Sequence, residues 1–79
     1  MKIIKNIKEL YLDYCKNIND FSFISKLNKL EILDLSNTNI SDISFLENNK
    51  NIKQLYLWYC KNIDKNDKIF KEKDIKIHY

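Results

Sequence analysis

The sequence predicts an α/β solenoid, with about four short parallel strands side by side and a return arc after each strand. Residues 6 to 20, NIKELYLDYCKNIND, come back almost unchanged at residues 51 to 65 as NIKQLYLWYCKNIDK, and a looser copy, KLEILDLSNTNISDI, begins at residue 29. The copies are 22 to 23 residues apart. A period of this length is typical of architectures in which each unit buries its apolar side only by stacking on its neighbours.

Each copy contains one strand and one arc. Apolar and polar residues alternate over residues 9 to 13, and this period of two predicts a strand. The apolar spacing then widens through residues 18 to 27, which indicates the return arc. Stacking is expected to place the inward leucines in two ladders, which are Leu10, Leu33 and Leu55, and Leu12, Leu35 and Leu57.

The spacing L-x-x-L-x-L-x-x-(N/C)-x-(x)-L over nearly the whole chain resembles that of leucine-rich repeats, with one extra residue after the Cys in the first and third copies. Thr38 stands where the family usually has Asn or Cys. The short arcs look like those of the internalin-like and phosphatase-regulator-like subclass. The resemblance implies a short right-handed solenoid with strands on a concave face and irregular or 3-10 arcs on a convex face. The matching positions are Ile7, Leu10, Leu12, Cys15 and Ile18, then Leu30, Leu33, Leu35, Thr38 and Ile40, then Ile52, Leu55, Leu57, Cys60 and Ile63.

At 79 residues the chain is expected to be a single domain. Its predicted repeats are about 7–29, 30–51 and 52–74, with a degraded final strand at 74–78. Three repeats are about the minimum that stand alone, so the ends of the stack matter for stability.

The chain has no glycine and no proline, and its abundant residues favour codons rich in A and T, which suggests an AT-rich genome. Without glycine, the corners after the strands need another residue that tolerates positive φ. Asparagine is the next choice. We therefore predict Asn17, Asn39 and Asn62 at these corners, in a structural role.

No apolar run reaches the roughly 18 residues of a membrane span, and the first ten residues lack the apolar segment of a secretory signal. The sequence therefore predicts a cytoplasmic protein that does not enter membranes, or one of the host cytoplasm if the source is a virus. Cys15 and Cys60 lie two repeats apart. With strands about 4.8 Å apart, their Cα atoms are too distant for a disulfide, and free thiols are expected. Thr38, between them, is expected to be buried and bonded to backbone.

The formal net charge is +3, but the lysines alternate with acidic residues. Asp64/Lys68 and Asp67/Lys71 have the i, i+4 spacing, with the acid first, that favours ion pairs on a helix. This segment is predicted to be a solvated helical turn that caps the solenoid, and not an arm for nucleic acid.

The sequence offers no catalytic, metal or cofactor site. Loops that hold phosphate need glycine, and the chain has none. Both cysteines fall on inward positions, and the single histidine, His78, lies on the last strand, so a Cys/His dyad is not expected. Metal sites need clustered ligands, which this spacing does not supply. Asp20 and Asp42 recur with the arc and are expected to bond local backbone.

The strand side chains that point away from the core form the candidate site. We expect these side chains to form three rows across the strands, followed by a fourth set at the strand exits. The rows are Glu9, Ile32, Gln54 and Asp74, then Tyr11, Asp34, Tyr56 and Lys76, then Asp13, Ser36, Trp58 and His78, and the exits hold Tyr14, Asn37, Tyr59 and Tyr79. Exposed aromatic residues are enriched at binding hot spots, although they also pack across strands merely to stabilise a sheet. The predicted partner-binding residues are Tyr11, Tyr14, Asp34, Tyr56, Trp58 and Tyr59.

The resemblance implies a non-catalytic module that binds a protein partner on the concave face. An alternative is a structural fragment that stacks end to end through Ile3 and Ile4 at one end and Ile75 and Ile77 at the other. Binding of single-stranded nucleic acid by aromatic stacking is a third reading, but the chain lacks arginine and the acids of this face would repel phosphate. Phe45 is expected on the convex side, as a control position outside the site.

Overall fold

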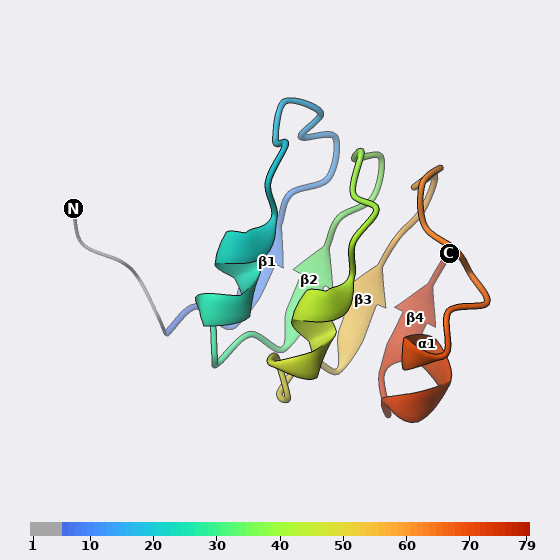
Figure 1. Ribbon diagram of the computed structural model, residues 1–79. Helices are drawn as coiled ribbons and strands as arrows, with labels where there is room; N and C mark the ends of the chain where they lie inside the picture. Colours follow the sequence, from blue (N-terminus) through green and yellow to red (C-terminus); the bar gives the residue numbers. More distant parts are fainter. Residues whose placement is uncertain (1–5) are drawn as a thin grey trace.

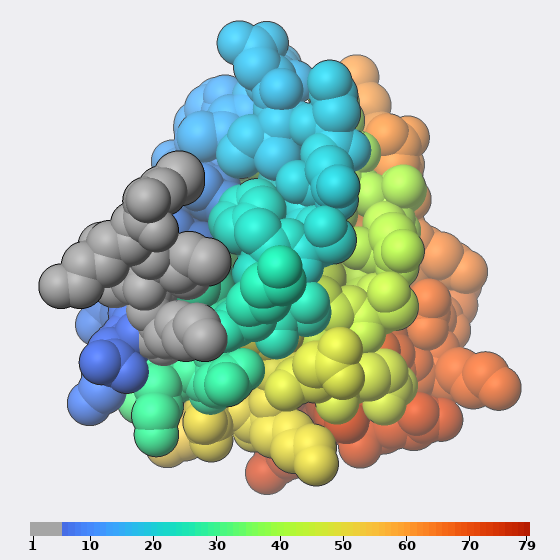
Figure 2. All heavy atoms as spheres, turned by 60° about the vertical axis from the view of Figure 1, so that its left-hand side comes forward, coloured from blue at the N-terminus to red at the C-terminus, as the bar shows by residue number. Residues whose placement is uncertain are grey.

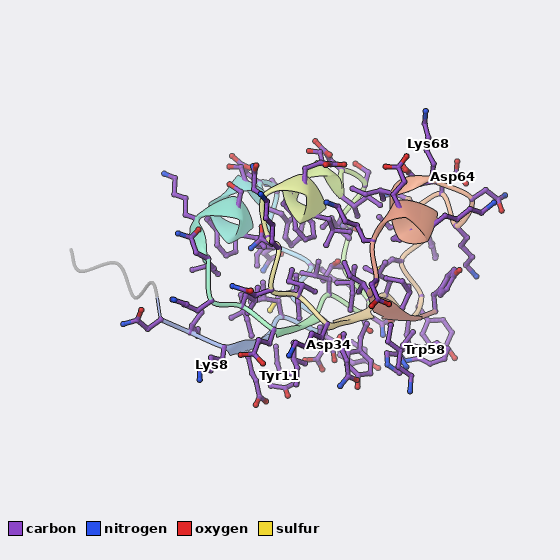
Figure 3. All side chains as sticks on the ribbon, turned by 90° about the horizontal axis from the view of Figure 1, so that it is seen from below. Lys8, Tyr11, Asp34, Trp58, Asp64 and Lys68 are labelled. Carbon is purple, nitrogen blue, oxygen red and sulfur yellow. The ribbon has the colours of Figure 1, made fainter. Side chains whose placement is uncertain are left out.

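The computed structural model describes residues 6–79, and its strands form one parallel sheet in the order β1-β2-β3-β4. All arcs lie on one side of this sheet (Figures 1 and 3). The predicted solenoid is therefore confirmed. The strands are β1 (Glu9–Tyr11), β2 (Ile32–Asp34), β3 (Gln54–Tyr56) and β4 (Lys76–His78), and the arcs contain the 3-10 helices η1 (Ser22–Lys26) and η2 (Ser44–Glu47) and the one-turn helix α1 (Ile69–Glu72).

The core is built from the predicted leucine ladder. Leu10 pairs with Leu33, and Leu33 pairs with Leu55. Successive coils stack in sequence order, so burial is greatest in the middle of the molecule (Figure 2). Side chains at the two ends of the stack are only half-buried, and these are Ile7, Leu10, Leu12 and Ile18 at the β1 end and Ile63, Phe70, Ile75 and Ile77 at the β4 end.

The predicted register of the last strand is wrong by two residues. Lys76 pairs with Gln54, and His78 pairs with Tyr56, whereas the sequence analysis placed Asp74 and Lys76 at these positions. The 22-residue period persists into this strand and aligns Ile77 with Leu55. The same period moves Tyr79 from the strand exit to an inward position, where its ring lies 6.0 Å from that of Phe70.

The predicted corners at Asn17, Asn39 and Asn62 are also wrong. The residues with positive φ are Tyr14, Asn37 and Tyr59. Each is the third residue after the end of its strand. Asparagines near the corners have another structural role, because they bond to the preceding coil. The Asn39 amide donates to the Lys16 carbonyl, and the Asn62 amide donates to the Asn39 carbonyl.

Acidic side chains of the arcs bond to local backbone. Asp20 and Asp42 accept hydrogen bonds of 2.9 Å from the N–H groups of Ser22 and Ser44, as predicted. These bonds hold the pKa of both carboxyls below its ordinary value because they favour the charged form.

The expected ion pairs of the lysine-rich segment do not form. The Asp64 and Asp67 side chains accept instead from the N–H groups of Asn66 and Ile69, because α1 begins only at Ile69. Within residues 6–79, the single ion pair joins Lys73 at the end of α1 to Glu47 of η2, at 3.7 Å.

Two polar side chains are buried in the solenoid. Thr38 donates to the Leu35 carbonyl at 2.7 Å, as expected of a small buried residue between the two cysteines. Asn49 is only 2% exposed and its amide donates to the carbonyls of Ile24 and Leu27. This bond across coils was not anticipated from the sequence.

Phe45 lies in the arc helix η2, on the convex side as expected, but its side chain is buried, so it does not serve as a control position on the surface. Phe23 of η1 is the exposed phenylalanine of the arcs. Among residues 6–79, every helix is too short and too polar to cross a membrane. The predicted apolar end at Ile3 and Ile4 lies outside the described residues.

Candidate functional site

The open face is the side of the sheet that points away from the arcs, and it carries three rows of side chains. Tyr11, Asp34 and Trp58 point outward from it (Figure 3). The first row is Glu9, Ile32, Gln54 and Lys76, the second is Tyr11, Asp34, Tyr56 and His78, and the third is Asp13, Ser36 and Trp58, with Tyr14, Asn37 and Tyr59 at the strand exits.

Ser36 accepts hydrogen bonds from the backbone of both aromatic flanks. The Trp58 N–H donates to the Ser36 hydroxyl at 3.0 Å, and the Tyr14 N–H donates to the Ser36 carbonyl at 2.9 Å. The Ser36 N–H in turn donates to Asp34 Oδ1 at 2.9 Å. Because Ser36 is buried, these bonds are shielded from water and fix the backbone on both sides of β2.

The strand exits hold two tyrosines in the left-handed conformation. Tyr14 has φ 65° and Tyr59 has φ 59°, a region that is uncommon for bulky side chains and costs about 1–2 kcal/mol per residue. Asn37 occupies the same position of the central coil with φ 56°, and asparagine tolerates this conformation better. The rings of Tyr14 and Tyr59 are 69% and 79% exposed, so packing does not account for them.

Tyr56 differs from the other aromatic residues of the site. Its ring stacks on His78 with a centroid distance of 4.1 Å and an interplanar angle of 7°, and its hydroxyl donates to Gln54 at 3.1 Å. Cross-strand packing therefore explains Tyr56, as the second reading of the sequence allowed. The stack with His78 was missed because the predicted register of β4 was wrong.

Negative charge surrounds the Tyr11 phenol. Its hydroxyl donates to Glu9 at 2.7 Å, and this bond is the main reason that the pKa of Tyr11 lies above its ordinary value. The charges of Glu9 and Asp34 add to the effect. The part of the open face at β1 and β2 is therefore electronegative and aromatic.

A hollow of about 470 Å³ lies beside the exit of β3. Its lining includes Trp58, Tyr59 and Tyr79, together with Lys61 and Lys65. The Lys65 ammonium lies 5.5 Å from the centroid of the Tyr79 ring, within the range of a cation–π contact. The hollow thus offers apolar ring surface next to the third row of the open face.

The structure brings the six predicted site residues onto one side of the molecule, but in two groups. Tyr11, Asp34 and Tyr56 form the second row, because they are partners across neighbouring strands. Tyr14, Trp58 and Tyr59 lie at the strand exits or next to them. Ser36, which links the groups, could be found from the sequence as a position of the third row, but its hydrogen bonds could not.

Within residues 6–79, no three His, Cys, Asp or Glu side chains lie close enough together to hold a metal ion. Cys15 and Cys60 are free thiols. Cys60 is buried and its thiol donates to the Leu35 carbonyl at 3.0 Å, so it is part of the core.

A family model described as Leucine Rich repeats (2 copies) matches residues 5–48 and again residues 28–70. The chain belongs to the leucine-rich repeats. Domains of this family generally mediate protein–protein interaction and are typically non-catalytic. Neither a comparison with curated proteins nor one with solved structures found a match.

Proposed function

We propose that this leucine-rich-repeat domain binds a protein partner on its open face, in the manner of the short-arc subclass that the sequence resembles. The observation that carries the proposal is the conformation of Tyr14 and Tyr59. Both residues have a strained backbone and an exposed side chain. The equivalent position of the central coil holds Asn37, a residue that tolerates positive φ better than tyrosine. Strain of this kind is typical of functional positions.

The aromatic surface has the composition of a binding site. Tyr11 and Trp58 are 56% and 46% exposed, and rigid amphipathic rings are the side chains most enriched at interaction hot spots. The core does not depend on these rings. A partner that covers them gains apolar burial without any rearrangement of the solenoid.

Affinity capture with matched baits tests the proposal. The baits are wild-type protein, a Trp58→Ala, Tyr59→Ala double variant and a Phe23→Ala control, each checked for folding by circular dichroism. Phe23 is 41% exposed on η1, away from the open face. We expect a protein from the source organism to bind wild type and the control, and to bind the double variant at least about tenfold more weakly, as hot-spot truncations do. Equal capture by all three baits, or loss with Phe23→Ala, would contradict the proposal.

A second candidate function is end-to-end stacking with a further copy or with further repeats. It is favoured by the half-buried apolar side chains at both ends of the stack, such as Leu10 and Ile77. The sheet edges at β1 and β4 also have one strand neighbour each. Sedimentation velocity over a range of concentrations tests this function. Stacking requires that the sedimentation coefficient of wild type rises with concentration and that Ile77→Lys abolishes this rise. A monomer at every concentration would exclude self-association.

The free thiols of Cys15 and Cys60 support a reducing compartment, since oxidising compartments promote disulfides. We therefore include the cytoplasm in the proposal as the place where the domain meets its partner.

A further inference from the structure

The charge of the open face is opposite to that of the chain. The whole chain has a formal net charge of +3. The second and third rows of the open face contain two carboxylates, Asp13 and Asp34, and no lysine. The first row contains Glu9 and Lys76, and Lys8 also points from this side at the start of β1 (Figure 3). Within the three rows, lysine therefore occurs at the start of the strands, whereas Lys16, Lys61 and Lys65 lie near the strand exits.

The carboxylates of the open face are uncompensated within the described part of the chain. The ion pair of residues 6–79 joins Lys73 to Glu47 on the arc side. Asp34 accepts one hydrogen bond at Oδ1, from the Ser36 N–H, and Oδ2 points to no donor among these residues. The raised pKa of Tyr11 agrees with this geometry, because its hydroxyl is bonded to Glu9 and the charges of Glu9 and Asp34 also act on it.

Aromatic rings flank the central carboxylate. Tyr11 and Tyr56 are the Cα partners of Asp34 on the two neighbouring strands. The Cα atom of each tyrosine therefore lies about 5 Å from the Cα atom of Asp34 across the sheet. An aromatic face attracts a cation, and Lys and Arg are the side chains that use this attraction in proteins. A carboxylate between two tyrosines is thus suited to a cationic side chain.

We infer that the partner segment on the open face is basic, and that it places a Lys or Arg side chain against Asp34, between Tyr11 and Tyr56. This inference rests on the proposed function and specifies its partner. Asp13 and Glu9 add attraction on the β1 side, while Trp58 and Tyr59 provide apolar contact on the β3 side. Lys61 lines the hollow beside Trp58 and Tyr59, and with Lys16 and Tyr59 it lines a second hollow at the exit turns. The basic side chain of the partner is therefore placed against Asp34 and not at the strand exits.

Two triple variants separate the charge of the open face from the charge of the chain. The first is Glu9→Gln, Asp13→Asn, Asp34→Asn, which keeps the oxygen that accepts from Tyr11 and the oxygen that accepts from Ser36. The second is Asp20→Asn, Asp42→Asn, Asp64→Asn on the arcs, where the acceptor oxygens for backbone N–H groups are likewise kept. Each variant removes three negative charges.

The probe is a displayed library of random 12-residue peptides, selected on wild-type protein. The recovered peptides are then labelled with a fluorophore, and their affinities for wild type, the two triple variants and the Trp58→Ala, Tyr59→Ala double variant are measured by fluorescence anisotropy. We expect Lys and Arg to be enriched in these peptides. We expect affinity to fall about tenfold in the open-face variant and less than about twofold in the arc variant, and also to fall as salt is raised.

The outcomes distinguish this inference from the proposed function. Peptides that need Trp58 but show no excess of Lys and Arg, or that bind both triple variants equally well, would refute the basic partner and leave the binding face in place. Acidic peptides bound near Lys16 and Lys61 would refute it in the same way. A selection that yields no peptide dependent on Trp58 or Tyr59 would refute both.

Discussion

The Ser36 hydroxyl accepts a hydrogen bond from the Trp58 N–H across two neighbouring coils. Trp58 is half-exposed, whereas Ser36 is buried, so the bond joins the open face to the interior. The Asn37 N–H donates to the Trp58 carbonyl at 2.8 Å. The backbone of Trp58 is therefore held at both its N–H and its carbonyl by the central coil.

Replacement of Ser36 by alanine is expected to destabilise the domain by about 1–2 kcal/mol, because the Trp58 N–H then loses its acceptor in a partly buried position. Urea unfolding followed by circular dichroism measures this change. Ser41→Ala, at an exposed serine of the following arc, is the control and should change the free energy of unfolding by less than about 0.5 kcal/mol. Equal effects of the two substitutions would show that the bond does not contribute to stability.

Leucines of one ladder should differ in their importance to folding according to their place in the stack. Leu33 is fully buried between two neighbours, while its partner Leu10 is half-buried at the β1 end. We expect Leu33→Ala to cost about 2–5 kcal/mol and Leu10→Ala clearly less. Thermal melts of the two variants test this order, and a reversed order would contradict the arrangement of the core.

The sequence predicted the ladder correctly because burial in a solenoid follows from local spacing. Leu10, Leu33 and Leu55 repeat the same distance from neighbouring apolar residues, and stacking carries that spacing into three dimensions. The last strand was misaligned because residues 74 to 79 contain no leucine to fix the register. Only the 22-residue period does so.

The corners and the aromatic flanks were harder to predict. Residue preference pointed to Asn39 for positive φ, but the coil turns where the inter-strand hydrogen bonds end, and that position holds Asn37 in one repeat and Tyr59 in another. The choice of Tyr11, Asp34, Tyr56 and Trp58 followed from alternation along the strands, and that of Tyr14 and Tyr59 from their place at the strand exits. The role of Ser36 did not, because a bond between its hydroxyl and Trp58 depends on how the neighbouring coils are offset.

The two thiols should differ in reactivity. The sequence predicted inward positions for both cysteines, but Cys15 is half-buried in the first coil and Cys60 is buried. We expect iodoacetamide to label Cys15 first in the native state, and both residues in denaturant without a reductant. Mass spectrometry over a time course measures the rates. Faster labelling of Cys60 would contradict the burial of the third coil.

Acid should destabilise the arcs through Asp20 and Asp42. Hydrogen bonds lower the pKa of both carboxyls in the folded protein, so their contribution to stability is complete above the unfolded pKa of about 3.9. It is lost as pH falls through the lower, folded-state pKa. An Asp20→Asn, Asp42→Asn variant lacks these titrations, so its melting temperature should fall less than that of wild type between pH 5 and about pH 2. Identical pH profiles would contradict the prediction.

Tyr59→Asn should stabilise the fold and weaken binding at the same time. Asparagine tolerates the positive φ of this position better than tyrosine, so we expect the free energy of unfolding to rise by up to about 1 kcal/mol. Loss of the ring, which is 79% exposed, removes contact with the partner, and affinity should fall by more than about 1 kcal/mol. The reciprocal change, Asn37→Tyr, should destabilise the domain. If Tyr59→Asn instead lowers stability, the ring contributes to packing, and the strain at the strand exits no longer supports a binding role.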